Sequence, residues 1–227
     1  MRRLRDIAIA LAVVALCVYG VVAQFNSDAA PPVEILDIQP IEVGELLQID
    51  FALRDIETPP KPRNLMAAYG RTATVLYSWS VPCPCILDME PRLRAVQARY
   101  PDHDVRWIAL AGEPGDSLEA VRTKAAEMEV FYPIYRDPEQ LVLRRLGIRH
   151  AGQVAVLDGE GRLVYRGAAD DHWDEGKAEH LQAVLDALTA GQPAPFETKP
   201  RAYGCAFALP ASCLSEDAAA TDRLEGS

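Results

Sequence analysis

The feature that most constrains the fold is a buried strand that leads directly into two cysteines and a helix. Residues 72–79 form a continuous apolar and β-branched run, which is typical of a central strand covered on both faces. Cys83, Pro84 and Cys85 follow it closely. Beyond them, apolar residues recur at helical spacing up to Pro101: Ile86, Met89, Leu93, Val96 and Tyr100. The sequence therefore predicts a strand, a cysteine turn and a helix.

The rest of the chain alternates strands and helices. Strand patterns occupy residues 46–53 and 105–111, and a hairpin is expected from 154–157 and 163–166 around the turn 158–161. Helical patterns occupy residues 116–128, with Asp116 or Ser117 as cap, 138–147 and 176–190. This order predicts an α/β sandwich with a central mixed sheet flanked by helices.

The position of Cys83 indicates a reactive thiol. A cysteine at the turn from a strand into a helix faces free amide groups and the positive end of the helix dipole, which favour the thiolate. Cys83 and Cys85 are thus the candidate catalytic residues, and Pro84 fixes the first helical turn. Trp79 is expected either to shield the site and offer an apolar docking surface, or to be a plain core residue.

The N-terminus predicts export from the cytoplasm. Three arginines precede an uncharged apolar run at residues 7–23, so residues 1–23 are a signal anchor in the cell membrane or a cleaved signal peptide. The remaining chain is expected on the periplasmic side, or secreted to the periplasm after cleavage. We expect a tether and N-terminal extension at 24–45, a domain at 46–191 and a Cys-containing extension at 192–227 whose end is disordered.

Residues 49–190 resemble the thioredoxin-like redoxins, in particular the membrane-anchored TlpA-type thiol–disulfide oxidoreductases and related redoxin-domain proteins. The resemblance rests on four segments: Phe51-Ala-Leu-Arg-Asp, Tyr77-Ser-Trp-Ser-Val-Pro-Cys-Pro-Cys, Met89-Glu-Pro-Arg-Leu and Gly159-Glu-Gly-Arg-Leu-Val-Tyr-Arg-Gly. It implies a thioredoxin-like sandwich, thiol–disulfide exchange with exported protein thiols or disulfides, and no cofactor.

The chain departs from this family at the second cysteine. The family turn is Cys-X-X-Cys, and Trp79 and Pro91 keep the family spacing to Cys83. Ile86 therefore stands where the second cysteine is expected, and Cys85 lies one residue early. A Cys83–Cys85 disulfide would close a very small ring, so we expect it to be strongly oxidising or transient.

A second departure concerns the loop before the hairpin, where family members carry a cis-proline. Ala151 and Gly152 stand at that position, which is expected to open space beside the thiols and leaves His150 close by. Residues 197–207 resemble a C-terminal Gly-Cys segment of some redoxin-domain proteins. On this resemblance Cys205 either returns to resolve Cys83 or pairs with Cys213 as a structural clip.

Thiol–disulfide exchange is thus the leading hypothesis, and two alternatives remain. Cys83, Cys85 and His150 could bind Cu(I) as in a metallochaperone. A peroxiredoxin-like peroxidase is less well supported, because Leu76 replaces the expected proline and Arg149 is poorly placed. The net charge of −10 argues against nucleic-acid binding.

Overall fold

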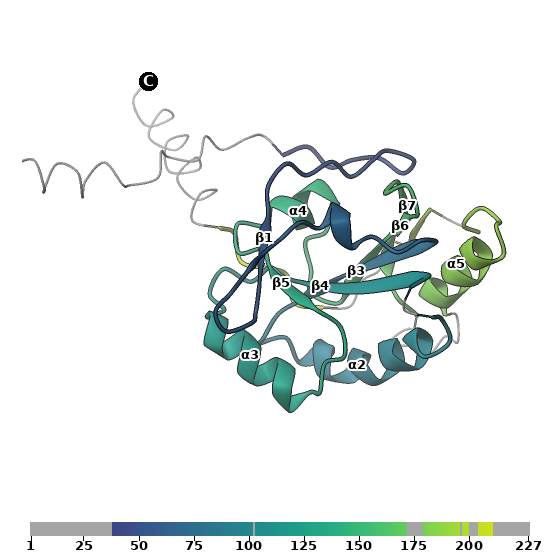
Figure 1. The fold of residues 1–227 in the computed structure, drawn as a ribbon. Coiled ribbons are helices and arrows are strands. Elements are labelled where there is room, and N and C mark those ends of the chain that lie inside the picture. Colours follow the sequence, from purple (N-terminus) through teal and green to yellow (C-terminus); the bar gives the residue numbers. More distant parts are fainter. Residues whose placement is uncertain (1–37, 102, 172–178, 196, 200–203, 211–227) are drawn as a thin grey trace, which may run out of the picture. The chain divides into compact units, whose positions relative to one another are not determined.

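The computed structural model describes residues 38–101, 103–171, 179–195, 197–199 and 204–210. These residues form one eight-stranded sheet in the order β2-β1-β5-β4-β3-β6-β7-β8 (Figure 1). Its strands are β1 (Leu53–Asp55), β2 (Pro62–Arg63), β3 (Ala73–Trp79), β4 (Val105–Ala111), β5 (Ile134–Arg136), β6 (Gln153–Asp158), β7 (Leu163–Ala168) and β8 (Thr198–Lys199). The helices are the 3-10 turn η1 (Met66–Ala68), α2 (Pro84–Gln97), α3 (Leu118–Glu127), α4 (Leu141–Arg145) and α5 (His180–Thr189).

Strand β3 forms the centre of the sheet. It pairs in parallel with β4 and antiparallel with β6, and all seven of its residues are buried. This matches its largely apolar and β-branched sequence, because a strand covered on both faces needs no polar alternation. The predicted mixed α/β sheet is confirmed, and its best-buried strand ends four residues before Cys83.

The helices pack on both faces of the sheet. Helices α2 and α3 connect parallel neighbours, β3 to β4 and β4 to β5, and right-handed crossovers place both on the same side. Figure 1 shows α2 and α3 on one side of the sheet and α4 on the other. The end of the α2 segment contacts α5, since the Tyr100 hydroxyl donates to Asp186 Oδ1 at 2.7 Å.

The strand expected at residues 46–53 is wrong. Only Leu53 is in a strand, and Leu46 makes one isolated bridge, to Arg162. The Leu47 amide donates instead to the Gly161 carbonyl oxygen in the β6–β7 turn, at 2.9 Å. The segment therefore packs over the hairpin as irregular chain, and its alternating sequence reflects burial of Leu47 rather than a ladder.

Three short strands were not predicted from the sequence: β2, β5 and β8. Each has two or three residues, too few to produce a recognisable period. Strand β2 begins with Pro62, which is tolerated there because β2 is an edge strand. The helix predicted at 138–147 is shorter in the structure, where it is α4. Of the final helix, predicted at 176–190, the structure describes α5.

Residues 38–45, the last part of the predicted tether and N-terminal extension at 24–45, pack against the folded domain. Ile41 is buried, and its amide donates to the Arg145 carbonyl oxygen at 2.8 Å. The Gly44 amide donates to the Leu163 carbonyl oxygen at 2.7 Å. The predicted anchor at 7–23, Cys213 and the predicted disordered end lie outside the described residues. Among the helices that the structure describes, none has the length and apolar character to span a bilayer.

Candidate thiol site

Cys83 lies at the start of α2, as predicted. It is the N-cap residue, its backbone is extended, and Pro84 occupies the first helical turn. The Asp116 carboxylate holds the preceding turn, because its Oδ2 accepts a hydrogen bond from the Val81 amide at 2.8 Å. Cys83 is only 2% exposed. The chain thus directs a shielded thiol toward a helix N-terminus.

A segment from the end of the chain covers this thiol. We call residues 204–208 the C-terminal arm. Within it, the Cys205 amide donates a hydrogen bond to Cys83 Sγ at a nitrogen–sulfur distance of 3.3 Å. Cys83, Cys85 and Cys205 are free thiols, with Cys83 buried, Cys85 partly buried and Cys205 exposed. The structure therefore brings together two cysteines that are 122 residues apart in sequence.

The C-terminal arm binds the loop before β6 as an antiparallel partner. The Ala151 amide donates to the Cys205 carbonyl oxygen at 3.0 Å, and the Phe207 amide donates to the Arg149 carbonyl oxygen at 3.1 Å. An isolated antiparallel bridge pairs His150 with Ala206 between them. These bonds fix the register of the arm, and hence the position of Cys205.

Side-chain contacts anchor the far end of the arm. Phe207 is 9% exposed and packs near Gly112, where an added Cβ would lie 3.5 Å from the Phe207 ring. Gln140 Nε2 donates to the Ala208 carbonyl oxygen at 2.6 Å, and the Ala208 amide donates to Glu113 Oε2 at 3.2 Å. An apolar anchor and polar contacts therefore hold the arm against the domain.

Gly204 allows the arm to approach the loop closely. A Cβ at this position would lie 1.6 Å from the Ala151 carbonyl oxygen, far inside any permitted contact. Backbone lies against backbone there, so no side chain can rotate aside. Within the Gly-Cys pair noted in the sequence, glycine is thus required by the close approach, and the next residue contacts Cys83 through its backbone amide.

The loop that receives the arm carries no proline, as its sequence indicates. Gly152 has a φ of +86°, and its amide donates to the Ser78 carbonyl oxygen of β3 at 2.8 Å. The Ser78 hydroxyl donates to the His150 carbonyl oxygen at 2.7 Å. Among the described residues, the cis peptide bond is Thr58–Pro59, remote in sequence from this loop. The space expected beside the thiols is filled by the C-terminal arm.

The electrostatic environment gives the three thiols different pKa values. Burial alone would raise the pKa of Cys83, but hydrogen bonds from the backbone and thiol of Cys205, and then from Cys85, lower it below its usual value. The pKa of Cys205 is raised to about 11, mainly by the hydrogen bond of its thiol to Cys83. Burial and the nearby Cys83 charge raise the pKa of Cys85. Negative charge is therefore most stable on Cys83.

Trp79 is fully buried, so the expectation that it offers an exposed docking surface is wrong. It ends β3, where both faces of the sheet are covered, and it is a core residue instead. His150 contributes backbone groups to the arm-binding loop and is partly buried. The described residues contain no group of three donors arranged for a metal ion. Cu(I) binding by Cys83, Cys85 and His150 stays a prediction.

The sequence analysis did not predict the roles of several residues that shape the site. Asp116 and Gln140 are polar but buried, and each supports a turn or the arm through one hydrogen bond to the backbone. Ser78 is hidden inside the apolar β3 run and holds the arm-binding loop. The polar interruption of that run is the local signal that could have indicated Ser78. No such signal marks Asp116 or Gln140, because their hydrogen bonds depend on long-range packing.

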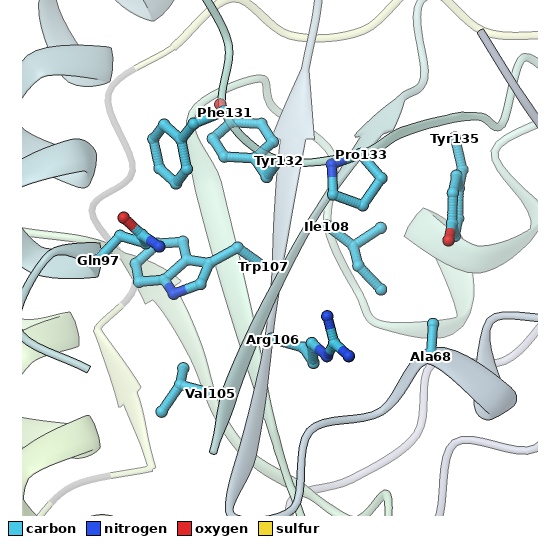
Figure 2. A pocket seen from close by; sticks show the side chains of 10 residues that line it. All are labelled: Ala68, Gln97, Val105, Arg106, Trp107, Ile108, Phe131, Tyr132, Pro133 and Tyr135. Carbon is cyan, nitrogen blue, oxygen red and sulfur yellow. The ribbon is translucent and has the colours of Figure 1, made fainter. Parts of the chain in front are cut away.

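Helix α2 also carries a buried carboxyl group. Glu90 is 4% exposed and accepts a hydrogen bond from the Tyr132 hydroxyl. Burial raises the pKa of Glu90. Tyr132 also lines a cavity of about 260 Å³, and Figure 2 shows Trp107, Phe131 and Tyr132 at one end of it and Ala68 and Tyr135 at the other. No cysteine lines this cavity, so it is separate from the thiol site.

The strand order, the position of Cys83 and the hairpin define a thioredoxin-like fold, which the comparisons with solved structures support. An uncharacterized conserved protein from Geobacillus kaustophilus is 23% identical, with a TM-score of 0.64 over 75% of this chain and 93% of that one. A hypothetical protein from Sinorhizobium meliloti is also 23% identical, with a TM-score of 0.64 over 76% and 97%.

A third similar structure comes from Bacteroides thetaiotaomicron and is named as a candidate protein disulfide isomerase. It is 18% identical, with a TM-score of 0.52 over 65% of this chain and 90% of that one. No family model matches the chain, and no curated protein is similar to it. The function must therefore be argued from the site itself.

Proposed function

We propose that this protein is a thiol–disulfide oxidoreductase that acts on exported proteins, with Cys83 as its low-pKa thiol. The observation that carries the proposal is the contact between the Cys205 amide and Cys83 Sγ at 3.3 Å. It adds a backbone donor to those of the helix N-terminus, and it brings a second thiol to the first. A nucleophile and a resolving thiol are what dithiol–disulfide exchange needs.

Cys205 is the better candidate for the resolving cysteine. Cys85 is part of the first turn of α2, and a bond from it to Cys83 would close a very small ring. Cys205 approaches from a separate segment, and its amide already donates a hydrogen bond to Cys83 Sγ at 3.3 Å. In the proposed cycle, a Cys83–Cys205 disulfide accepts two electrons from a substrate dithiol, or the reduced pair gives two electrons to a substrate disulfide.

The site of action follows from the N-terminal sequence. The arginines and the apolar run at 7–23 support a membrane anchor or an export signal, with the domain on the periplasmic side. Disulfides persist in that compartment, which suits exchange with exported protein thiols or disulfides. Fractionation of cells that express the full chain tests this part of the proposal; recovery of the folded domain in the cytoplasm would reject it.

The central test compares three variants of the full chain: Cys83→Ser, Cys205→Ser and Cys85→Ser. The assay follows thiol–disulfide exchange with a reduced or oxidised small protein in separate reactions. Loss of both activities in Cys83→Ser is expected, because the lowest-pKa thiol is gone. Full activity of Cys83→Ser in both directions would reject the proposed function. A copper-loaded or peroxide-treated sample of the same variants tests the two alternative hypotheses by direct binding and by peroxide consumption.

A further inference from the structure

Cys83 and Cys205, the two thiols of the proposed pair, differ in solvent exposure. Cys83 is 2% exposed and lies under the C-terminal arm, whereas Cys205 is exposed. The arm is anchored on both sides of Cys205: by the close approach of Gly204 to Ala151 and by the burial of Phe207. A protein substrate that approaches the folded domain therefore reaches the Cys205 side of the pair first.

We infer that the oxidised protein exchanges with its substrates at the Cys205 sulfur, so that Cys205, and not Cys83, carries the mixed disulfide. The inference rests on the proposed function and gives it a direction: the protein acts as an oxidant of substrate thiols. Attack on a disulfide requires access to the sulfur that is attacked, and here the accessible residue is Cys205.

The leaving group supports the same choice. When a thiolate attacks one sulfur of a disulfide, the other sulfur departs as a thiolate, and the thiol of lower pKa departs faster. Attack at Cys205 releases Cys83, whose charge is stabilised by the start of α2 and by the Cys205 amide at 3.3 Å. Attack at Cys83 would release Cys205, which is exposed and lies outside the helices, so no helix N-terminus stabilises its charge.

Oxidation of a substrate dithiol takes two exchange steps. A substrate thiolate forms a bond to Cys205 Sγ, the Cys83–Cys205 bond breaks, and Cys83 leaves as a thiolate. A second thiolate of the same substrate then attacks the substrate sulfur of the mixed disulfide, which forms the substrate disulfide and releases Cys205 as a thiolate that takes a proton from water. Two electrons pass to the protein. A disulfide oxidant, such as oxidised glutathione, restores the Cys83–Cys205 bond.

In the opposite direction the same geometry is unfavourable. To reduce a substrate disulfide, the Cys83 thiolate would have to contact a substrate sulfur while the arm lies over it. The arm would first lose its bonds to Arg149 and Ala151 and the burial of Phe207. Oxidation through Cys205 needs no such displacement, because the substrate bonds to the arm itself.

The test traps the first step in the full chain carrying Cys85→Ser, which removes the neighbouring thiol. The protein is oxidised with glutathione disulfide, and disulfide mapping confirms the Cys83–Cys205 link. A short peptide with one cysteine is then added, free thiols are blocked with N-ethylmaleimide, and the digest is analysed by mass spectrometry. We expect the peptide on Cys205 and the maleimide on Cys83, in at least about tenfold excess over the reverse arrangement. The reverse arrangement, or failure of the link to form, would overturn the inference.

A second measurement separates this inference from the proposed function. Full-length Cys205→Ser is compared with the unchanged protein in single-turnover oxidation of a reduced small protein and in reduction of an oxidised one. We expect the oxidation rate to fall at least about tenfold, with Met66→Ser, at an exposed position outside the thiol site, as the control that keeps it. Equal oxidation by Cys205→Ser would overturn the inference while Cys83-dependent exchange survives. Activity independent of Cys83 would instead overturn the proposed function.

Discussion

The two cysteine segments of the site are held in place by different means. Cys83 is fixed by local structure, between a strand with seven buried residues and a helix that starts with Pro84. Cys205 belongs to no strand or helix and is held by bonds to Arg149 and Ala151 and by the burial of Phe207. One thiol is thus part of the core, and the other is attached to it.

This difference means that the two thiols can be disturbed separately. Changes around Cys83 affect β3 and α2, and so they threaten the fold. Changes in the C-terminal arm affect few contacts, and local release costs less than unfolding of the domain. The arm therefore offers variants that keep the domain folded while they remove Cys205 from Cys83.

The largest expected effect comes from Gly204→Ala. The new Cβ would lie 1.6 Å from the Ala151 carbonyl oxygen, and both atoms are held by backbone, so the arm has to move. We expect the effective concentration of Cys205 at Cys83 to fall about 100-fold or more, since a flexible chain replaces a docked one. The measurement is the equilibrium between the Cys83–Cys205 disulfide and glutathione.

Gly115→Ala is the matched control for this variant. A Cβ at Gly115 would have only the Glu113 carboxylate oxygen near it, at 4.0 Å. This variant should keep the disulfide equilibrium and the thermal stability of the unchanged protein. An unchanged equilibrium in Gly204→Ala would show that the arm is not held as described.

Phe207→Ala is expected to weaken docking of the C-terminal arm, as Gly204→Ala does, but by a smaller factor. The ring is 9% exposed, and its removal takes away about 1.5–3 kcal/mol of apolar burial, which loosens the arm by about 10- to 100-fold. The backbone bonds to Arg149 and Ala151 are retained. Alkylation of Cys83 by iodoacetamide should become faster by a similar factor. Leu209→Ala, at an exposed neighbouring position, should leave that rate unchanged.

The contrast between the two segments also explains what the sequence could predict. The strand, the cysteine turn and the helix around Cys83 follow from local hydrophobic pattern, and β3, β4 and α2 appear where the pattern places them. The docking of Cys205 depends on residues that are far apart in sequence, such as Ala151 and Gln140, and no local period marks them. The docking of Cys205 was suggested only by the resemblance of residues 197–207 to a segment of some redoxin-domain proteins. The alternative, a Cys205–Cys213 clip, stays a prediction.

The pH dependence of Cys83 tests the electrostatic part of the contrast. The folded-state pKa of Cys83 is lowered, so alkylation should rise with a midpoint below the usual thiol pKa of about 8.5. The sign for stability follows: the thiolate adds stability above the unfolded-state pKa, and this contribution is lost as pH falls through the folded-state pKa. Thermal melts of the reduced protein and Cys83→Ser should therefore diverge as pH rises.

Loss of the C-terminal arm should move that midpoint. In Gly204→Ala the Cys205 amide no longer reaches Cys83 Sγ, so the midpoint should rise toward the usual thiol value. A midpoint that is the same in both proteins would assign the low pKa to the start of α2 alone, and it would remove the arm from the electrostatics of the site.

Cys85→Ser should have the smallest effect. Cys85 is partly buried in the first turn of α2, its pKa is raised, and its bond to Cys83 would close a very small ring. With Cys205 as the partner, exchange activity should change by less than about threefold, because serine keeps a small polar side chain at this position. Disulfide mapping of the oxidised variant should show the Cys83–Cys205 link. If Cys85→Ser lost as much exchange activity as Cys83→Ser, and the unchanged protein showed a Cys83–Cys85 link, Cys85 would be the resolving cysteine. The C-terminal arm would then only shield Cys83.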